Sequence, residues 1–327
     1  MRGRWGAGCS GDRWGGEAAA MAHFGFCPPY GGLDFGLGAE TANPPTRPHA
    51  HTPIHLLFLA ISVAAYSADE KTVEIAGVVS DGAKPIAGAT VRLRTTSIVT
   101  TSDDQGRFTL GVPDKTWPVR VTASKDGYYI RGADAQKGAK DVKIVIEPYP
   151  ATDAANFQWT GFLPNPDVKD SCGNCHSNIM NPWLKAGHAS SHRNPVFKSF
   201  YLGTDAHGKP GVGQGYRLDF PNTVGACAAC HVPAAALDAP WATDPSKVKD
   251  TDTAGIHCHF CHLVVDVDLK DLGRRPGVLA MKFRRPPPPK RLFLGPFDDM
   301  DRGAGGYVPL YTQSAYCAPC HEAEYWG

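Results

Sequence analysis

The chain has 327 residues and a formal net charge of +1, with 33 Lys and Arg nearly balanced by 32 Asp and Glu. That length is enough for two domains with their own cores, and the charge balance argues against nucleic acids or acidic membrane surfaces as direct partners. The abundance of Gly (36) and Pro (28) favours strands and irregular structure over long helices.

Residues 1–68 are predicted to be a leader and a signal peptide. Residues 1–46 show no hydrophobic periodicity, which indicates a disordered leader or a start placed too early. The apolar run IHLLFLAISVAA (54–65) is too short to span a bilayer and is typical of a signal peptide, although a buried core helix is the alternative. We therefore expect export to the periplasm, the outer surface or the extracellular medium.

Residues 69–148 are predicted to form a small all-β sandwich. Short β-branched runs, separated by turn sequences such as DDQGR and KDG, lie at 72–81, 89–96, 97–112, 117–130 and 141–148. The segments GVVSDGAKPIAGATVRL, TTSDDQGRFTL and VTASKDGYY resemble carboxypeptidase regulatory-like domains, which implies a transthyretin-like sandwich. The block shows no catalytic constellation, so it is a spacing module or a docking surface. Residues 149–170, in which prolines recur, are predicted to be a linker.

Residues 171–327 contain four C-x-x-C-H motifs, which use every cysteine that follows the predicted signal. They are Cys172, Cys175 and His176; Cys227, Cys230 and His231; Cys258, Cys261 and His262; and Cys317, Cys320 and His321. This is the attachment motif of haem c. Two thiols one helical turn apart bind the vinyl groups of one porphyrin, and the following histidine is the proximal iron ligand. We therefore predict four covalent haems.

Zinc is the main alternative, because four C-x-x-C pairs could supply two Cys₄ sites. Zinc ribbons, however, usually separate their pairs by about 15–20 residues. The intervals from Cys175 to Cys227 and from Cys261 to Cys317 are much longer. Zinc also gives no reason for a histidine after every second cysteine. The pattern favours haem.

Each haem iron has a second axial position, which a histidine can fill. Five histidines after the predicted signal lie outside the four motifs. We predict His188 and His257 as distal ligands, with His192 as a further candidate. His188 and His192 are four residues apart and would share one face of a short helix. His207 and His259 are predicted not to be ligands, with His259 at the surface between two thioethers.

The haem region resembles exported bacterial multihaem cytochromes c of the cytochrome c554 type. The resemblance covers roughly residues 157–327 and rests on WLKAGHASSHRNPVFKSFYLGTD, GYRLDFPNTVGACAACHVPAAALDAPWATDPSKV, GIHCHFCHLVVDV, RPGVLAMKFRRPPPPKRLFLGPFDD and YVPLYTQSAYCAPCHEAEYWG. It implies a mostly α-helical and irregular domain organised around stacked, mostly bis-histidine haems, and it supports His188 and His257. The sequence stops soon after His321, so we expect a truncated C-terminus.

The segment 283–303 carries charged residues around four consecutive prolines. Its arginines are predicted to pair with haem propionates, and its aspartates to lie in a solvated loop, with calcium binding as the alternative. These residues are Arg284, Arg285, Arg291, Asp298, Asp299 and Asp301.

The sequence thus predicts an exported tetrahaem electron carrier whose partners are other redox proteins or cytochromes, with self-association into a haem chain as a variant. An oxidoreductase with one open haem, acting on a small nitrogen or sulfur compound, is the alternative. A structural or adhesive surface protein is a third reading. Membrane association is expected only through partners.

Overall fold

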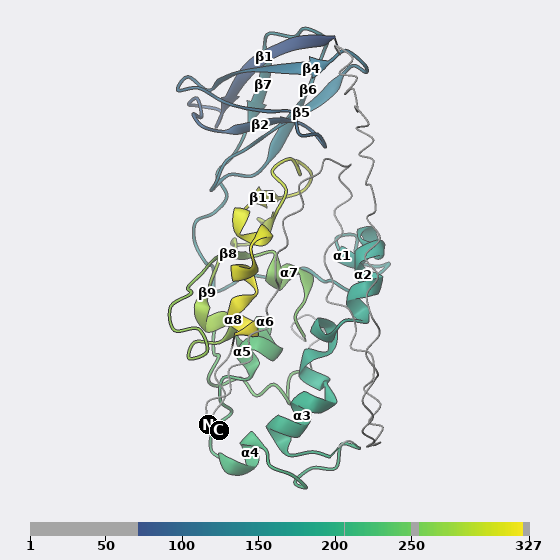
Figure 1. The fold of residues 1–327 in the computed structure, drawn as a ribbon, viewed down its shortest axis with the longest axis vertical. Coiled ribbons are helices and arrows are strands. Elements are labelled where there is room, and N and C mark those ends of the chain that lie inside the picture. The colour runs from purple at the N-terminus through teal and green to yellow at the C-terminus, as the bar shows by residue number, and fades with distance from the viewer. Residues whose placement is uncertain (1–70, 206, 250–254, 323–327) are drawn as a thin grey trace, which may run out of the picture. The chain divides into compact units, whose positions relative to one another are not determined.

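The computed structural model describes residues 71–205, 207–249 and 255–322. The predicted leader and signal peptide, residues 1–68, lies outside the described residues. The described chain starts with a β-sandwich-like region and continues as a region of short helices and irregular structure (Figure 1). All described residues belong to one contact unit, Asp69–Gly327.

The sandwich consists of two sheets. The first has three strands in the order β4-β1-β7, with β1 (Thr72–Ser80) antiparallel to β4 (Arg107–Pro113) and parallel to β7 (Val142–Val145). The second has four antiparallel strands in the order β3-β2-β5-β6: β3 (Val99–Thr101), β2 (Thr90–Leu93), β5 (Val119–Ser124) and β6 (Arg131–Ala135).

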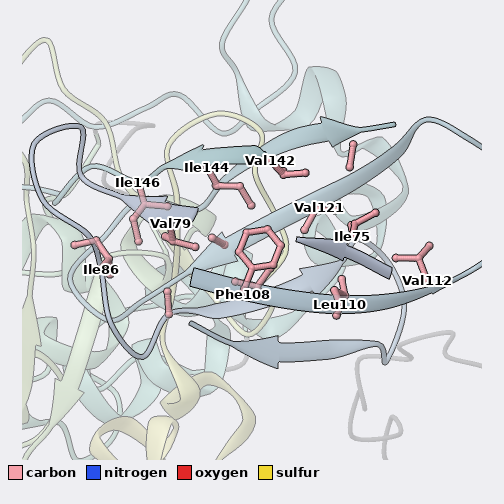
Figure 2. Close-up of a cluster of buried hydrophobic side chains, with 14 residues drawn as sticks. Ile75, Val79, Ile86, Phe108, Leu110, Val112, Val121, Val142, Ile144 and Ile146 are labelled. Carbon is pink, nitrogen blue, oxygen red and sulfur yellow. The ribbon is translucent and has the colours of Figure 1, made fainter. Parts of the chain in front are cut away.

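Alternating side chains build the core between the two sheets. In β4, Phe108, Leu110 and Val112 are buried while the residues between them are exposed. This period of two is what a strand with one buried face requires. Figure 2 shows these side chains with those of β1 and β7, among them Ile75 and Ile144. The predicted sandwich is confirmed.

The approach of β1 to β7 depends on a glycine in β1. A Cβ atom at Gly77 would lie 2.0 Å from the carbonyl oxygen of Val142, which is far inside van der Waals contact. The parallel pairing places Gly77 directly opposite Val142. Only a residue without a side chain allows this pairing.

The second region contains short helices. They are α1 (Cys172–Cys175), α2 (Ser177–Leu184), α3 (Pro195–Leu202), α4 (Tyr216–Asp219), α5 (Ala228–His231), α6 (Pro233–Ala236), α7 (Cys258–Cys261) and α8 (Ala318–His321), with 3₁₀ turns η1 (Gly187–Arg193), η2 (Gly277–Ala280), η3 (Pro309–Thr312) and η4 (Ser314–Tyr316). Two strand pairs complete it: antiparallel β8 (Val264–Val267) with β9 (Met281–Phe283), and parallel β10 (Phe293–Gly295) with β11 (Gly305–Tyr307). Within the described ranges, no helix is long and apolar enough to cross a bilayer.

A second apolar cluster surrounds the third motif. Phe260 lies inside that motif, and it packs with Leu263, Val264, Leu292 and Leu294. All five side chains are buried. This cluster gives α7 a fixed position although the helix itself is only one turn long.

The predicted linker, residues 149–170, contributes to the packing of this region. Tyr149 and Phe162 are buried, and Phe157 and Trp159 pack against the apolar cluster around α7. These aromatic side chains attach the segment to the protein at several points.

The aspartate-rich loop after the prolines pairs with arginines of the four-stranded sheet. Arg92 Nε lies 2.7 Å from Asp298 Oδ1, and Arg120 lies 2.7 Å from Asp301 Oδ2. Arg94 Nε lies 3.4 Å from the other oxygen of Asp301. The side chain of Asp301 is only 2% exposed. The expectation of a solvated loop is therefore wrong, because three arginines of the sandwich neutralise its carboxylates.

Candidate haem-attachment site

All four C-x-x-C-H motifs adopt the same backbone turn. In each, the histidine N–H donates to the carbonyl oxygen of the first cysteine: His176 to Cys172 at 2.9 Å, His231 to Cys227 at 3.1 Å, His262 to Cys258 at 3.0 Å and His321 to Cys317 at 3.1 Å. This is the bond of one α-helical turn, and it puts residues i and i+3 on one side. The local spacing that two thioether bonds to one porphyrin require is thus present at each motif.

The motifs meet in pairs that differ from their order in the chain. A hydrogen bond between the side chains of Cys172 and Cys258 raises the pKa of Cys172 and lowers that of Cys258. Likewise a hydrogen bond between Cys320 and Cys230 raises the pKa of Cys320. The first motif therefore touches the third, and the second touches the fourth.

Tyrosine hydroxyls connect the third motif with the fourth. The carbonyl oxygen of Cys261 accepts hydrogen bonds from Tyr311 at 2.6 Å and from Tyr316 at 2.8 Å. Tyr316 directly precedes Cys317. Burial raises the pKa of the Cys261 thiol to about 11, with smaller contributions from Cys320 and Cys317. The contact order of the motifs is thus first, third, fourth and second.

Two of the predicted proximal histidines are oriented by backbone carbonyls. Nδ1 of His231 lies 3.1 Å from the carbonyl oxygen of Ser191, and Nδ1 of His262 lies 2.5 Å from that of Leu294. A carbonyl only accepts, so Nδ1 carries the proton and Nε2 keeps a lone pair. This is how metal-binding histidines are usually held. Phe197 stacks on the ring of His231 at 3.8 Å between ring centroids.

In His257 and His259 the Nδ1 atom accepts a hydrogen bond instead of donating one. Nδ1 of His257 accepts from the N–H of Phe260 at 3.2 Å, and Nδ1 of His259 accepts from that of Thr160 at 2.8 Å. In the neutral rings the proton is therefore on Nε2. Coordination of an iron through Nε2 would require these bonds to break. The predicted distal role of His257 therefore needs a rearrangement of its ring.

His259 is buried, contrary to the expectation of a surface position. Only 1% of it is exposed, and its ring packs against Phe157, Trp159 and Phe293. Burial, followed by the effect of the nearby His257, lowers the pKa of His259 to about 3. The aromatic residues that cover it come from the predicted linker and from β10, which are distant in sequence.

His188 and His192 do not share a helical face. They lie in η1, which is interrupted at Ser190 by non-helical backbone angles (φ −120°, ψ 15°). The ring of His188 lies 6.0 Å from that of His321. His192 lies near the second motif instead. Burial lowers the pKa of His231 and the nearby His192 lowers it further, while the bond to Ser191 opposes the shift. His207 is exposed.

The arginines predicted to meet haem propionates are engaged with the protein. Arg285 forms ion pairs with Asp153 and Asp238, each at 2.7 Å. Arg291 lies 2.9 Å from Asp170, and Arg284 donates to the carbonyl oxygen of Ala151.

The residues present fit haem c better than zinc. Across the parts of the chain that the structure describes, no three His, Cys, Asp or Glu side chains gather as ligands of one metal ion. The Cys₄ clusters and the calcium site therefore lack a ligand set. Four equal turns, each with two thiols followed by an imidazole, are what haem c would use.

Comparison with solved structures finds distant likenesses to parts of this chain. Two mutants of a type II cohesin–X-dockerin complex from Acetivibrio cellulolyticus are 18% and 17% identical, cover 24% and 30% of this chain and 58% and 64% of theirs, and have TM-scores of 0.19. The shaft pilin SpaA from Lactobacillus rhamnosus GG is 19% identical over 25% of this chain and 49% of its own, with a TM-score of 0.21.

This chain thus spans less than two thirds of each of these proteins. No protein-family model and no curated protein matches it. None of the three structures is a cytochrome, so the haem interpretation rests on the residues themselves.

Proposed function

We propose that the chain is an exported tetrahaem c-type cytochrome that passes electrons between redox partners. The observation that carries the proposal is the convergence of the four motifs. Cys172 touches Cys258, Cys230 touches Cys320, and Tyr316 joins the fourth motif to Cys261. Groups attached at motifs in contact would be neighbours, and electron-transfer proteins need neighbouring redox centres.

Each motif would hold one haem through its two cysteine sulfurs, with the following histidine as proximal ligand. When bound, the haems supply one-electron redox chemistry. The protein orients the imidazoles: the carbonyls of Ser191 and Leu294 hold the Nδ1 protons of His231 and His262. Phe197 fixes the ring plane of His231 by stacking.

The proposed partners are other redox proteins or cytochromes, met outside the cytoplasm after export. The sandwich is joined to the region of the motifs, because its Arg92 and Arg120 pair with Asp298 and Asp301 of the loop after the prolines. Self-association into a longer haem chain belongs to the same proposal.

The test is a haem count and a spectrum of the protein matured with a haem c attachment system. We expect four covalent haems per chain, low-spin in the oxidised form, with reduction by dithionite. Replacing both cysteines of any one motif by alanine should remove one haem. A protein that matures without covalent haem would overturn the proposal.

An oxidoreductase with one open haem is the second candidate, and two observations favour it. His257 and His259 have Nδ1 in accepting roles, so fewer histidines are ready to act as distal ligands. A cavity of about 310 Å³ is lined by His259, Trp159, Lys290 and Arg291, which suits a small polar or anionic molecule. Carbon monoxide separates the candidates: an electron carrier with four six-coordinate irons ignores it, whereas an open haem binds it.

A further inference from the structure

The rings of His188 and His321 lie next to each other although they come from η1 and α8. Their centroids are 6.0 Å apart and their planes are inclined by 57°. Two imidazoles on opposite sides of one metal ion, at bonds of roughly 2 Å each, have ring centres about 6 Å apart. Both residues are exposed.

From this geometry we propose that His188 and His321 are the two axial ligands of one iron, that of the haem attached at Cys317 and Cys320. The inference rests on the proposed function and deepens it. It assigns a distal ligand to a particular haem, and it makes the iron of the fourth motif six-coordinate within this chain.

The position of His188 is fixed by backbone contacts with the segment before the third motif. Its carbonyl oxygen accepts from the N–H of Ile256 at 2.9 Å, and the indole of Trp183 donates to the carbonyl of Ile256 at 3.0 Å. Gly255 has φ +70°, and a Cβ there would lie 2.9 Å from the carbonyl oxygen of His188. The ring of His188 is thus presented by a backbone that is bonded independently of the fourth motif.

His321 is held by its own motif. Its N–H donates to the carbonyl of Cys317 at 3.1 Å, and Cys320 touches Cys230 of the second motif. The two imidazoles therefore approach each other from two supports. A pair presented in this way needs little reordering when it binds a metal ion.

The other histidines outside the four motifs are not presented as distal ligands in this way. His192 is separated from His188 by the kink at Ser190 and lies beside the second motif. His207 is exposed in a loop. His257 and His259 use Nδ1 as a hydrogen-bond acceptor.

The test compares His188→Ala with the matched control His207→Ala in the haem-loaded full chain. We expect four covalent haems in both variants. In His188→Ala one of the four should become high-spin by electron paramagnetic resonance and should bind carbon monoxide, and added imidazole should reverse both changes. His207→Ala should keep the wild-type spectrum. If His188→Ala fails to fold, His188→Met provides a second variant, which should stay low-spin with a shifted reduction potential.

The haem concerned is identified in a Cys317→Ala, Cys320→Ala background, which lacks the fourth haem. There His188→Ala should create no additional high-spin haem. An additional one would show that His188 serves another iron, and the assignment would fall. Four low-spin haems in His188→Ala would likewise overturn the pairing and leave the proposed function intact. Wild-type protein without covalent haem would overturn both.

Discussion

The side chains of Cys172 and Cys258 are hydrogen-bonded to each other, so the first C-x-x-C-H motif touches the third. Cys230 and Cys320 meet in the same way. Without haem, an exported chain exposes these thiol pairs to oxidants. Sulfurs in contact would react first with each other.

We therefore expect cross-motif disulfides when the chain is exported without a haem attachment system. Oxidised glutathione would take up the two electrons and two protons that each thiol pair loses. Peptide mapping by mass spectrometry should find Cys172 linked to Cys258 and Cys230 linked to Cys320. A Cys258→Ser variant should lose the first link and keep the second. Predominant links inside single motifs, such as Cys172 to Cys175, would contradict the motif contacts.

Replacing Asp301 by Asn should loosen the loop that pairs with the sandwich. The substitution leaves Arg120 and Arg94 without their shared carboxylate, which is 2% exposed. We expect a loss of about 2 kcal/mol in the free energy of unfolding, as for a buried charged group that loses its partner. Asp104→Asn is the control, because Asp104 is exposed in a turn. Urea unfolding measures both, and equal stability of the two variants would contradict the pairing.

Replacing Arg285 by Met should weaken the attachment of residues 149–170 to the region of short helices. Arg285 bridges Asp153 and Asp238, but Asp238 is 68% exposed, so solvent screens part of the pair. We expect a cost of about 1 kcal/mol. Arg274→Met, at an exposed position, should cost less.

The ion pair between Arg285 and Asp238 predicts that the stability of the protein depends on pH. The hydrogen bond from Arg285 lowers the pKa of Asp238. A carboxylate with a lowered pKa in the folded state stabilises it fully above its unfolded pKa of about 4, and this contribution is lost as the pH falls through the folded value. The stability gap between wild type and Arg285→Met should therefore be constant near neutral pH and shrink below a pH of about 4. A gap that widens in acid would be inconsistent with the ion pair.

Gly277→Ala should disturb the second C-x-x-C-H motif. Gly277 has φ +56°, and a Cβ there would lie 2.0 Å from the carbonyl oxygen of Ala229, which lies between the two cysteines of the second motif. Left-handed backbone and the clash together should cost about 2 kcal/mol. Gly295→Ala is the matched control, because no atom lies within 4 Å of its added Cβ. Thermal unfolding and the haem content of the peptide around Cys227 are the measurements.

The sequence by itself determined the features that depend on near neighbours. Alternation of apolar residues in β4 predicted the sandwich, and the C-x-x-C-H spacing predicted four single helical turns, which are present. Periods of two and of about 3.6 residues are local properties of the backbone, so they can be read from the chain. Strand β6 (Arg131–Ala135) was missed, since its sequence RGADA has no apolar run and its pairing with β5 defines it.

Only the tertiary structure decided which distant residues meet. It buried His259, placed His188 beside His321 and separated it from His192, and paired Asp301 with Arg120. It also arranged the motifs as first, third, fourth and second. These contacts join segments far apart in the chain, and their stability depends on packing and charge pairing that no local pattern encodes.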